Sequence, residues 1–236
     1  MKNGLKCVFG ILSALLIAGC SSSPNVALNK QFWTQSTQQP LVVALAQPPE
    51  AKLDLSGPRT LIGRVSSKTS TLKFSRYLKK FSVVDLSRFQ SQFVQKLEAN
   101  NISAKRYAGL IPTSKLQDFD GDEESYAKLD YKPLAIRLGN NRLLLLGINK
   151  FGAKRDYVVV VPTSNPVAFC DAEGQLIDLK TNKILWRYSV SKEKTSSDGW
   201  DKGSSYQGFT RVFNQVIDEA MNAVMADFFS HAPIKK

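Results

Sequence analysis

Side chains that could perform nucleophilic or acid–base chemistry are few in this sequence. Four Ser-x-x-Lys pairs occur, the spacing at which a lysine can activate a serine nucleophile: Ser70/Lys73, Ser125/Lys128, Ser189/Lys192 and Ser191/Lys194. Four such pairs are what chance produces in a chain rich in serine and lysine, and no Lys-Thr-Gly motif follows them. The one histidine, His231, lies close to the C-terminus, where chain ends fray. A Ser-His-Asp or Cys-His site is therefore not expected.

Metal-binding patterns are incomplete as well. Asp118, Asp120 and Asp122 alternate as in the first half of a calcium loop. That loop needs glycine and glutamate at two later positions, which hold Glu123 and Leu129 here. The segment is either a solvated acidic loop or a weak, irregular cation site. A zinc site of His and Cys is excluded by the number of these residues. Because the nucleophile and metal patterns are all incomplete, we expect no enzyme activity, no metal and no cofactor.

The N-terminus has the charge and length of an export signal. Lys2 and Lys6 supply positive charge, and the apolar stretch from Val8 to Ala18 is too short to cross a bilayer core about 30 Å thick. The four residues Ile17-Ala18-Gly19-Cys20 resemble the lipobox of bacterial lipoproteins.

The lipobox resemblance implies that residues 1–19 are a signal peptide and that Cys20 becomes the lipidated first residue. Acyl chains such as palmitate on Cys20 would then anchor the protein in a membrane. In the families resembled, serine at the second mature position, here Ser21, permits sorting to the outer membrane. Because Cys7 leaves with the signal, Cys170 remains alone, either as a buried inert thiol or in a mixed disulfide with a partner.

Positive charge is concentrated in one part of the chain. The net charge is +12, and eleven Lys and Arg lie between Arg59 and Arg106 against only Asp85 and Glu98. An exported lipoprotein meets little nucleic acid, so anionic headgroups, lipopolysaccharide phosphates, peptidoglycan carboxylates or an acidic protein are the available partners. The region is either a solvated basic face or a binding surface. In the second case four side chains would contact phosphates: Lys73, Arg76, Lys79 and Lys80.

Alternating apolar patterns predict one α/β domain over residues 41–230, behind a flexible tether at residues 20–40. Phe32 and Trp33 interrupt the tether and dock either on the domain or on the bilayer. Strands are predicted at 41–46, 60–66, 102–107, 142–149, 156–162, 167–179 and 183–190, and helices at 71–81, 85–100 and 209–229, with a loop at 47–58. This order predicts a single-domain sandwich: a mixed sheet with antiparallel C-terminal strands, packed by helices, with a long C-terminal helix.

Two motifs carry a family resemblance. Leu134–Gly139 followed by Leu143–Ile148 is similar to a "helix, Leu-Gly, strand" element, and Leu176–Arg187 is similar to a "strand, turn, Leu-Trp" hairpin. Both recur in bacterial envelope lipoproteins with the fold of the TolB amino-terminal domain, which include curli-export, polysaccharide-export and penicillin-binding-protein-activator lipoproteins. Asn182 stands where the turn usually has glycine, and both residues tolerate positive φ.

The resemblance implies a non-catalytic lipoprotein of the outer membrane that faces the periplasm and serves as an assembly or accessory subunit of an envelope complex. Its partners would be an envelope protein and further copies of itself. The alternative is a component that binds anionic lipid or lipopolysaccharide. Trp200, in the polar segment 192–207, either anchors a partner or folds back onto its own domain.

Overall fold

The computed structural model describes residues 24–34, 40–56, 69–80, 86–122, 124–159, 161–202 and 206–233. The predicted signal peptide, Cys20 and the predicted strand at 60–66 lie outside these ranges. The elements are η1 (Lys30–Trp33), β1 (Leu41–Ala46), β2 (Lys52–Ser56), α2 (Thr69–Lys80), α3 (Ser87–Ala99), β3 (Ala104–Ile111), η2 (Thr113–Lys115), α4 (Leu134–Leu138), β4 (Arg142–Val158), β5 (Val161–Pro162), β6 (Val167–Asp178), β7 (Lys183–Thr195) and α5 (Gln207–Ser230).

The strands form one mixed sheet in the order β3-β1-β4-β6-β7. The strand β1 runs parallel to both β3 and β4, whereas β4, β6 and β7 are successively antiparallel. Beyond the end of β1, the short strand β2 pairs with the second half of β4. The predicted α/β class, the mixed sheet with antiparallel C-terminal strands and the long C-terminal helix are confirmed.

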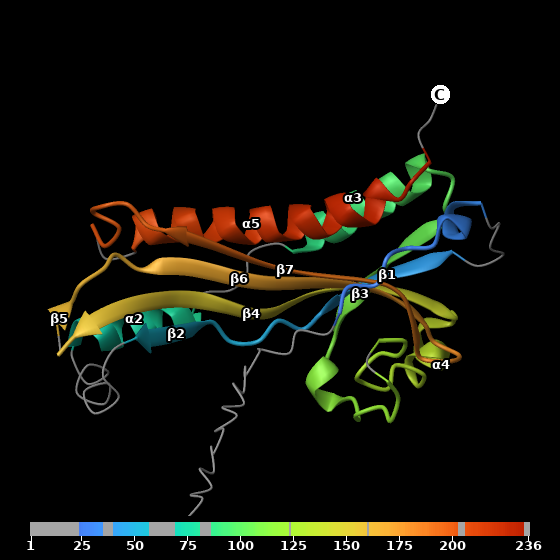
Figure 1. Cartoon of the computed structure of the whole chain (residues 1–236), viewed down its shortest axis with the longest axis horizontal. Coiled ribbons are helices and arrows are strands. Elements are labelled where there is room, and N and C mark those ends of the chain that lie inside the picture. Colours follow the sequence, from blue (N-terminus) through green and yellow to red (C-terminus); the bar gives the residue numbers. More distant parts are fainter. Residues whose placement is uncertain are drawn as a thin grey trace, which may run out of the picture.

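Helices cover the two faces of the sheet unequally (Figure 1). The long helix α5 and the shorter α3 lie on one face, and α4 with the segment before it lies on the other face at one end. Apolar residues recur every three or four positions in α5, so one side of the helix is buried: Phe209, Phe213, Val216, Ile217, Ala220, Met221, Val224, Met225 and Phe228. Among the described residues no helix is long and apolar enough to span a bilayer.

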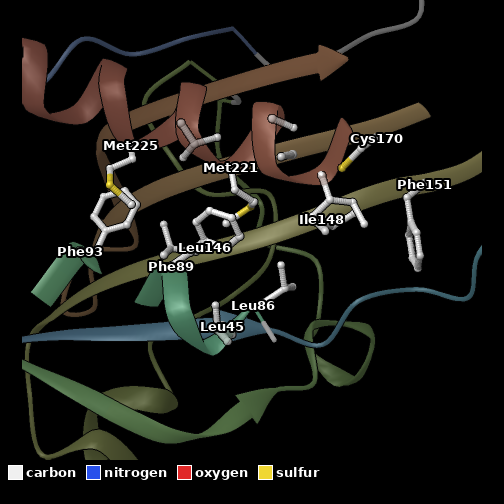
Figure 2. Packing of buried hydrophobic residues seen from close by; sticks show 14 of the residues in the cluster. Leu45, Leu86, Phe89, Phe93, Leu146, Ile148, Phe151, Cys170, Met221 and Met225 are labelled. Carbon is white, nitrogen blue, oxygen red and sulfur yellow. The ribbon is translucent and has the colours of Figure 1, made fainter. Parts of the chain in front are cut away.

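The leucine run at the start of β4 serves two cores. Successive side chains of a strand point to opposite faces, so Leu144 and Leu146 join the cluster under α5 and α3, while Leu143 and Leu145 join the cluster under α4. Figure 2 shows Leu146 and Ile148 of β4 facing Met221 and Met225 of α5 and Phe89 and Phe93 of α3. The run is therefore buried on both faces of the sheet.

Trp186 fills the space between β7 and α5. It is fully buried, its indole Nε1 donates a hydrogen bond of 2.8 Å to Asp227, and its ring packs edge-on against Phe228 at 4.8 Å. Gly174, on the neighbouring strand, makes room for it, because a Cβ at this position would lie 2.4 Å from the indole. Trp186 is therefore a core residue.

Two predicted boundaries are wrong. In place of separate strands at 142–149 and 156–162, β4 is a single strand of 17 residues that is kept extended by pairing with β6 as far as Lys154. In place of a loop at 47–58, residues 52–56 form β2, whose pairing with β4 satisfies its backbone although only its middle residues are partly buried.

The N-terminal segment is attached to the domain between Pro24 and Thr34, in place of the flexible tether predicted there. Val26 forms an antiparallel bridge with Arg187 of β7. Further along, Leu28, Phe32 and Trp33 are buried, and the Trp33 ring contacts Phe228 edge-on at 5.6 Å. Phe32 and Trp33 therefore dock on the domain, which is the first of the two docking sites predicted for them.

The attachment predicts a stability effect of Trp33→Ala. Removing this buried ring should lower the free energy of unfolding by about 3 kcal/mol, because the cavity lies against the end of α5. Urea unfolding of Trp33→Ala measures the change, with exposed Gln31→Ala as the matched control. Equal stability of the two variants would mean that the segment is not packed on the domain.

Candidate functional site

Trp200 is not an exposed partner anchor, so that part of the prediction is wrong. Its side chain is only 6% exposed. The indole packs edge-on against Phe74 of α2 at 4.9 Å and stacks on Tyr206 at 5.7 Å, and the Arg155 guanidinium lies 4.9 Å from its centre. Trp200 therefore fixes the β7–α5 connection to α2 and β4, which is the second of the two predicted readings.

The basic residues of α2 lie on its surface. Phe74 and Leu78 are buried, whereas Lys73, Arg76 and Lys79 are exposed on the other side of the helix. The Lys80 side chain lies outside the described part of the structure. None of these three exposed cations has an ion-pair partner among the described residues, and α2 contains no acidic residue. Their binding to a partner remains a prediction.

A groove of about 1000 Å³, lined by polar and apolar side chains, lies over the centre of the sheet. Its floor consists of β4, β6 and β7, and its walls are the β1–β2 connection (46–50) and the segment around η2. The floor side chains Glu173, Gln175 and Arg187 alternate with residues buried under α5, so the groove opens on the face opposite α5. We call this site the sheet groove.

A buried ion pair organises the sheet groove. Glu173 accepts hydrogen bonds from the Asn149 amide at 2.9 Å and the Ser189 hydroxyl at 3.2 Å, and its carboxylate lies 3.8 Å from the Arg187 Nε. The Arg187 side chain is 2% exposed, and its guanidinium donates to the main-chain oxygens of Pro24 at 3.4 Å and Tyr126 at 3.2 Å. The pair therefore joins the sheet, the N-terminal segment and the wall of the groove.

Tyr131, in the wall of the groove, is held in its neutral form. Burial raises the pKa of its phenol above the usual range, the Glu173 charge raises it further, and the Arg187 charge partly opposes these effects. On the other face of β6, burial raises the pKa of the Cys170 thiol from 9.0 to about 12, with a smaller effect from Asp171. General acid–base or nucleophilic catalysis needs the opposite shifts, toward neutral pH. Of the two alternatives predicted for Cys170, a buried inert thiol and a mixed disulfide with a partner, the structure has the buried thiol.

The acidic loop makes a turn. The Asp122 carboxylate accepts a hydrogen bond of 2.8 Å from the Ser125 amide, and this bond lowers the pKa of Asp122. Asp118 instead bridges Leu129 through its main chain. In the described ranges no three His, Cys, Asp or Glu side chains converge as a metal site would require. Glu123 lies outside those ranges.

The sheet groove was not predicted from the sequence. A signal for it exists in β6, where polar Asp171, Glu173 and Gln175 alternate with apolar residues and mark one face of the strand as polar. The matching residues on β7 and the wall around Tyr131 come from distant parts of the chain, so their convergence requires the fold.

No family model matches the chain, and no curated protein resembles it in sequence. Among solved structures it is similar to PelC from Paraburkholderia phytofirmans, a dodecamer, with 11% identity over 88% of this chain and 94% of that one and a TM-score of 0.34. It is also similar to the lipoprotein GNA1162 from Neisseria meningitidis (14% identity, 76% and 99%, TM-score 0.27) and to the C-terminal domain of LpoB from Salmonella enterica (15%, 69% and 90%, 0.18).

GNA1162 is a lipoprotein, the kind of protein that the two sequence motifs resemble. At these identities and TM-scores the likenesses carry no conclusion about activity, partners or assembly.

The ion pair predicts that Glu173→Ala is strongly destabilising. Its loss leaves the Arg187 charge buried without its carboxylate, which should lower the free energy of unfolding by about 3 kcal/mol. The matched control is Glu219→Ala, which removes the partner of Lys194 in an exposed pair and should cost less than about 0.5 kcal/mol. Denaturant unfolding compares the two variants, and equal costs would contradict the role given to the pair.

The Cys170 thiol predicts a loss of stability at alkaline pH. Its pKa is higher in the folded state (about 12) than the ordinary 9.0, so above pH 9 the unfolded chain releases a proton that the folded chain keeps. Between pH 8 and 10 this effect should cost about 1 kcal/mol of unfolding free energy. Cys170→Ala should lack that part of the loss, as measured by urea unfolding at both pH values. If the difference in unfolding free energy between Cys170→Ala and the parent is the same at pH 8 and pH 10, this prediction is contradicted.

Proposed function

We propose that this protein is a non-enzymatic accessory subunit of a cell-envelope complex, anchored in the outer membrane by acyl chains on Cys20 and facing the periplasm. The sequence Ile17-Ala18-Gly19-Cys20-Ser21 supports the anchor and its location. The sheet groove supports the binding role, because its polar side chains are fixed by one another and its titratable Tyr131 is held neutral.

The attachment of the N-terminal segment places the proposed anchor next to the domain. Only three residues separate Cys20 from Pro24, and four peptide steps span at most about 14 Å. The Pro24 oxygen is bonded to Arg187, which lines the groove. An acylated Cys20 would therefore hold the groove close to the membrane surface, where it can meet only partners in that layer.

The chemistry of the groove favours a polar protein segment as its occupant. Asp171 and Ser191 line it at β6 and β7, and the buried side-chain oxygen of Gln175 has no hydrogen-bond donor among the described residues. A main-chain amide or a basic side chain of a partner would satisfy these acceptors. A second copy of this chain could supply such a segment as well as a different protein could.

The anchor is tested by acylation and fractionation. We expect cells given an alkyne-tagged palmitate to label the parent protein, which should fractionate with the outer membrane. Cys20→Ala should lose both the label and the membrane fraction, whereas Cys170→Ala, which changes a buried thiol, should keep both. An unlabelled parent protein that remains in the aqueous fraction would overturn the anchor.

The groove is tested by site-specific photo-crosslinking in intact cells. A photoreactive residue at Ser191 should capture one defined envelope protein, or this chain itself, and one at Asn222 on the exposed side of α5 should not. Ser114→Trp, in the groove wall, should reduce the Ser191 product, whereas Lys115→Trp, its exposed neighbour outside the lining, should not. Equal products at Ser191 and Asn222 would contradict a specific groove partner.

A further inference from the structure

The far end of β4 carries an exposed apolar patch. In the β4–β5 hairpin Val158 pairs with Val161, and Val158, Val159 and Val161 are 60%, 53% and 59% exposed. Val159 has a φ of 60°, a left-handed conformation that is costly for a β-branched residue. Strained backbone of this kind concentrates at binding sites, and adjacent exposed valines mark a contact surface. We call this feature the valine tip.

The basic helix α2 is fixed to the valine tip. Tyr157, next to the exposed valines, is buried, and its hydroxyl lies 3.2 Å from the Thr71 hydroxyl in the first turn of α2. Figure 1 shows α2 beside the β5 end of the sheet. Leu72 follows Thr71 in the chain and is also partly exposed, so an apolar surface lies at the start of the helix.

Three exposed cations lie further along the same helix. Lys73, Arg76 and Lys79 recur every three residues, which places them along one side of α2. The nearest acidic side chain in sequence to the exposed valines is Asp156, and Asp54 of β2 is already paired with Lys150 at 3.2 Å. The described residues thus leave three cations of α2 without an ion pair, on the helix whose first turn contacts Tyr157 next to the tip.

We propose that the valine tip and the cations of α2 together bind a membrane surface that contains anionic phospholipid. The valines enter between the headgroups while Lys73, Arg76 and Lys79 contact phosphates, the division of apolar and basic groups found in interfacial membrane-binding segments. Charge complementarity favours this occupant over a second copy of the chain, because two such basic helices would repel each other.

The contact would act as a second attachment, distant from Cys20. The distance along β4 from Leu145, in the floor of the sheet groove, to Val158 at the tip is about 40 Å at 3.3 Å per residue. This inference rests on the proposed lipid anchor, which it extends: the acyl chains hold the protein in the membrane, and the tip sets the orientation of the sheet on it.

The test measures membrane contact at the tip in the full lipidated chain, purified from membranes and reconstituted into vesicles. Val159→Cys is labelled with an environment-sensitive dye, since Cys170 is buried and Cys20 is acylated. Bromine on the lipid chains should quench the label strongly in vesicles of phosphatidylcholine with 30% phosphatidylglycerol and several-fold less in phosphatidylcholine alone. The same dye at Asn222→Cys, on the exposed side of α5 and so on the face opposite the groove, should not be quenched in either.

The cations are tested in the same assay. Near an anionic membrane each Lys or Arg strengthens binding about five-fold, so Lys73→Gln, Arg76→Gln and Lys79→Gln together should weaken tip contact by about 100-fold. The control triple variant Lys105→Gln, Lys115→Gln and Lys180→Gln removes the same charge from exposed positions elsewhere. Its quenching should be unchanged.

The outcomes separate the tip from the anchor. Vesicles that float with the protein while the tip label stays unquenched would overturn the tip contact and leave the anchor intact. Protein that does not float without phosphatidylglycerol would overturn the anchor. Quenching that is equal in both lipids would overturn the proposed recognition of anionic lipid. Dye emission that depends on the density of protein on the vesicle and not on the lipid would also overturn it, in favour of contact between copies of the chain.

Discussion

The burial of the Arg187 charge is the constraint that ties separate parts of this structure together. A buried guanidinium is tolerated only where its charge is compensated, because desolvation of an unpaired ion costs several kcal/mol. Here Glu173 supplies the charge, and main-chain oxygens of Pro24 and Tyr126 accept from the guanidinium. Three separate parts of the chain must therefore be in place at once: the centre of the sheet, the N-terminal segment and the wall of the sheet groove.

The two faces of the sheet differ in how they are packed. Under α5 and α3 the side chains are apolar and closely packed, with Trp186 filling the space beside Gly174. On the opposite face the polar alternation of β6 stays partly open, because α4 and the segment before it cover only one end. The face under α5 and α3 is thus closed by packing, and the groove lies on the other face.

The sequence was sufficient for most elements because they carry strong periodic patterns. The helix α5 repeats apolar residues at three and four positions, and the leucines of β4 signal burial on both faces. The role of Trp200 was ambiguous because a lone tryptophan in a polar segment looks the same in the sequence whether it contacts a partner or its own domain. Here it packs against Phe74 of α2. Residues 150–155 of β4 were missed because their extended form depends on pairing with β6, which follows later in the chain.

The candidate site was harder to predict than the fold, for a physical reason. Asn182 illustrates this: the sequence indicated a residue that tolerates the positive φ of a turn, and the structure has it at 63°. Its side chain also accepts from the Tyr131 amide and donates to the oxygens of Ala127 and Leu129, which fastens the groove wall to the β6–β7 turn. Such side-chain bonds between distant segments leave no periodic trace in the sequence.

The length of β4 has a consequence for how the chain can vary. At 17 residues β4 spans about 55 Å and carries both the groove floor and the valine tip. Its register with β6 shifts between Ile148 and Lys150, so Ile148 and Phe151 belong to the same core cluster although three positions separate them. A bulge thus absorbs one extra residue and keeps the later apolar side chains on the face of α5. The reach of this strand can therefore change by a single residue, about 3 Å, wherever the sheet accepts a bulge.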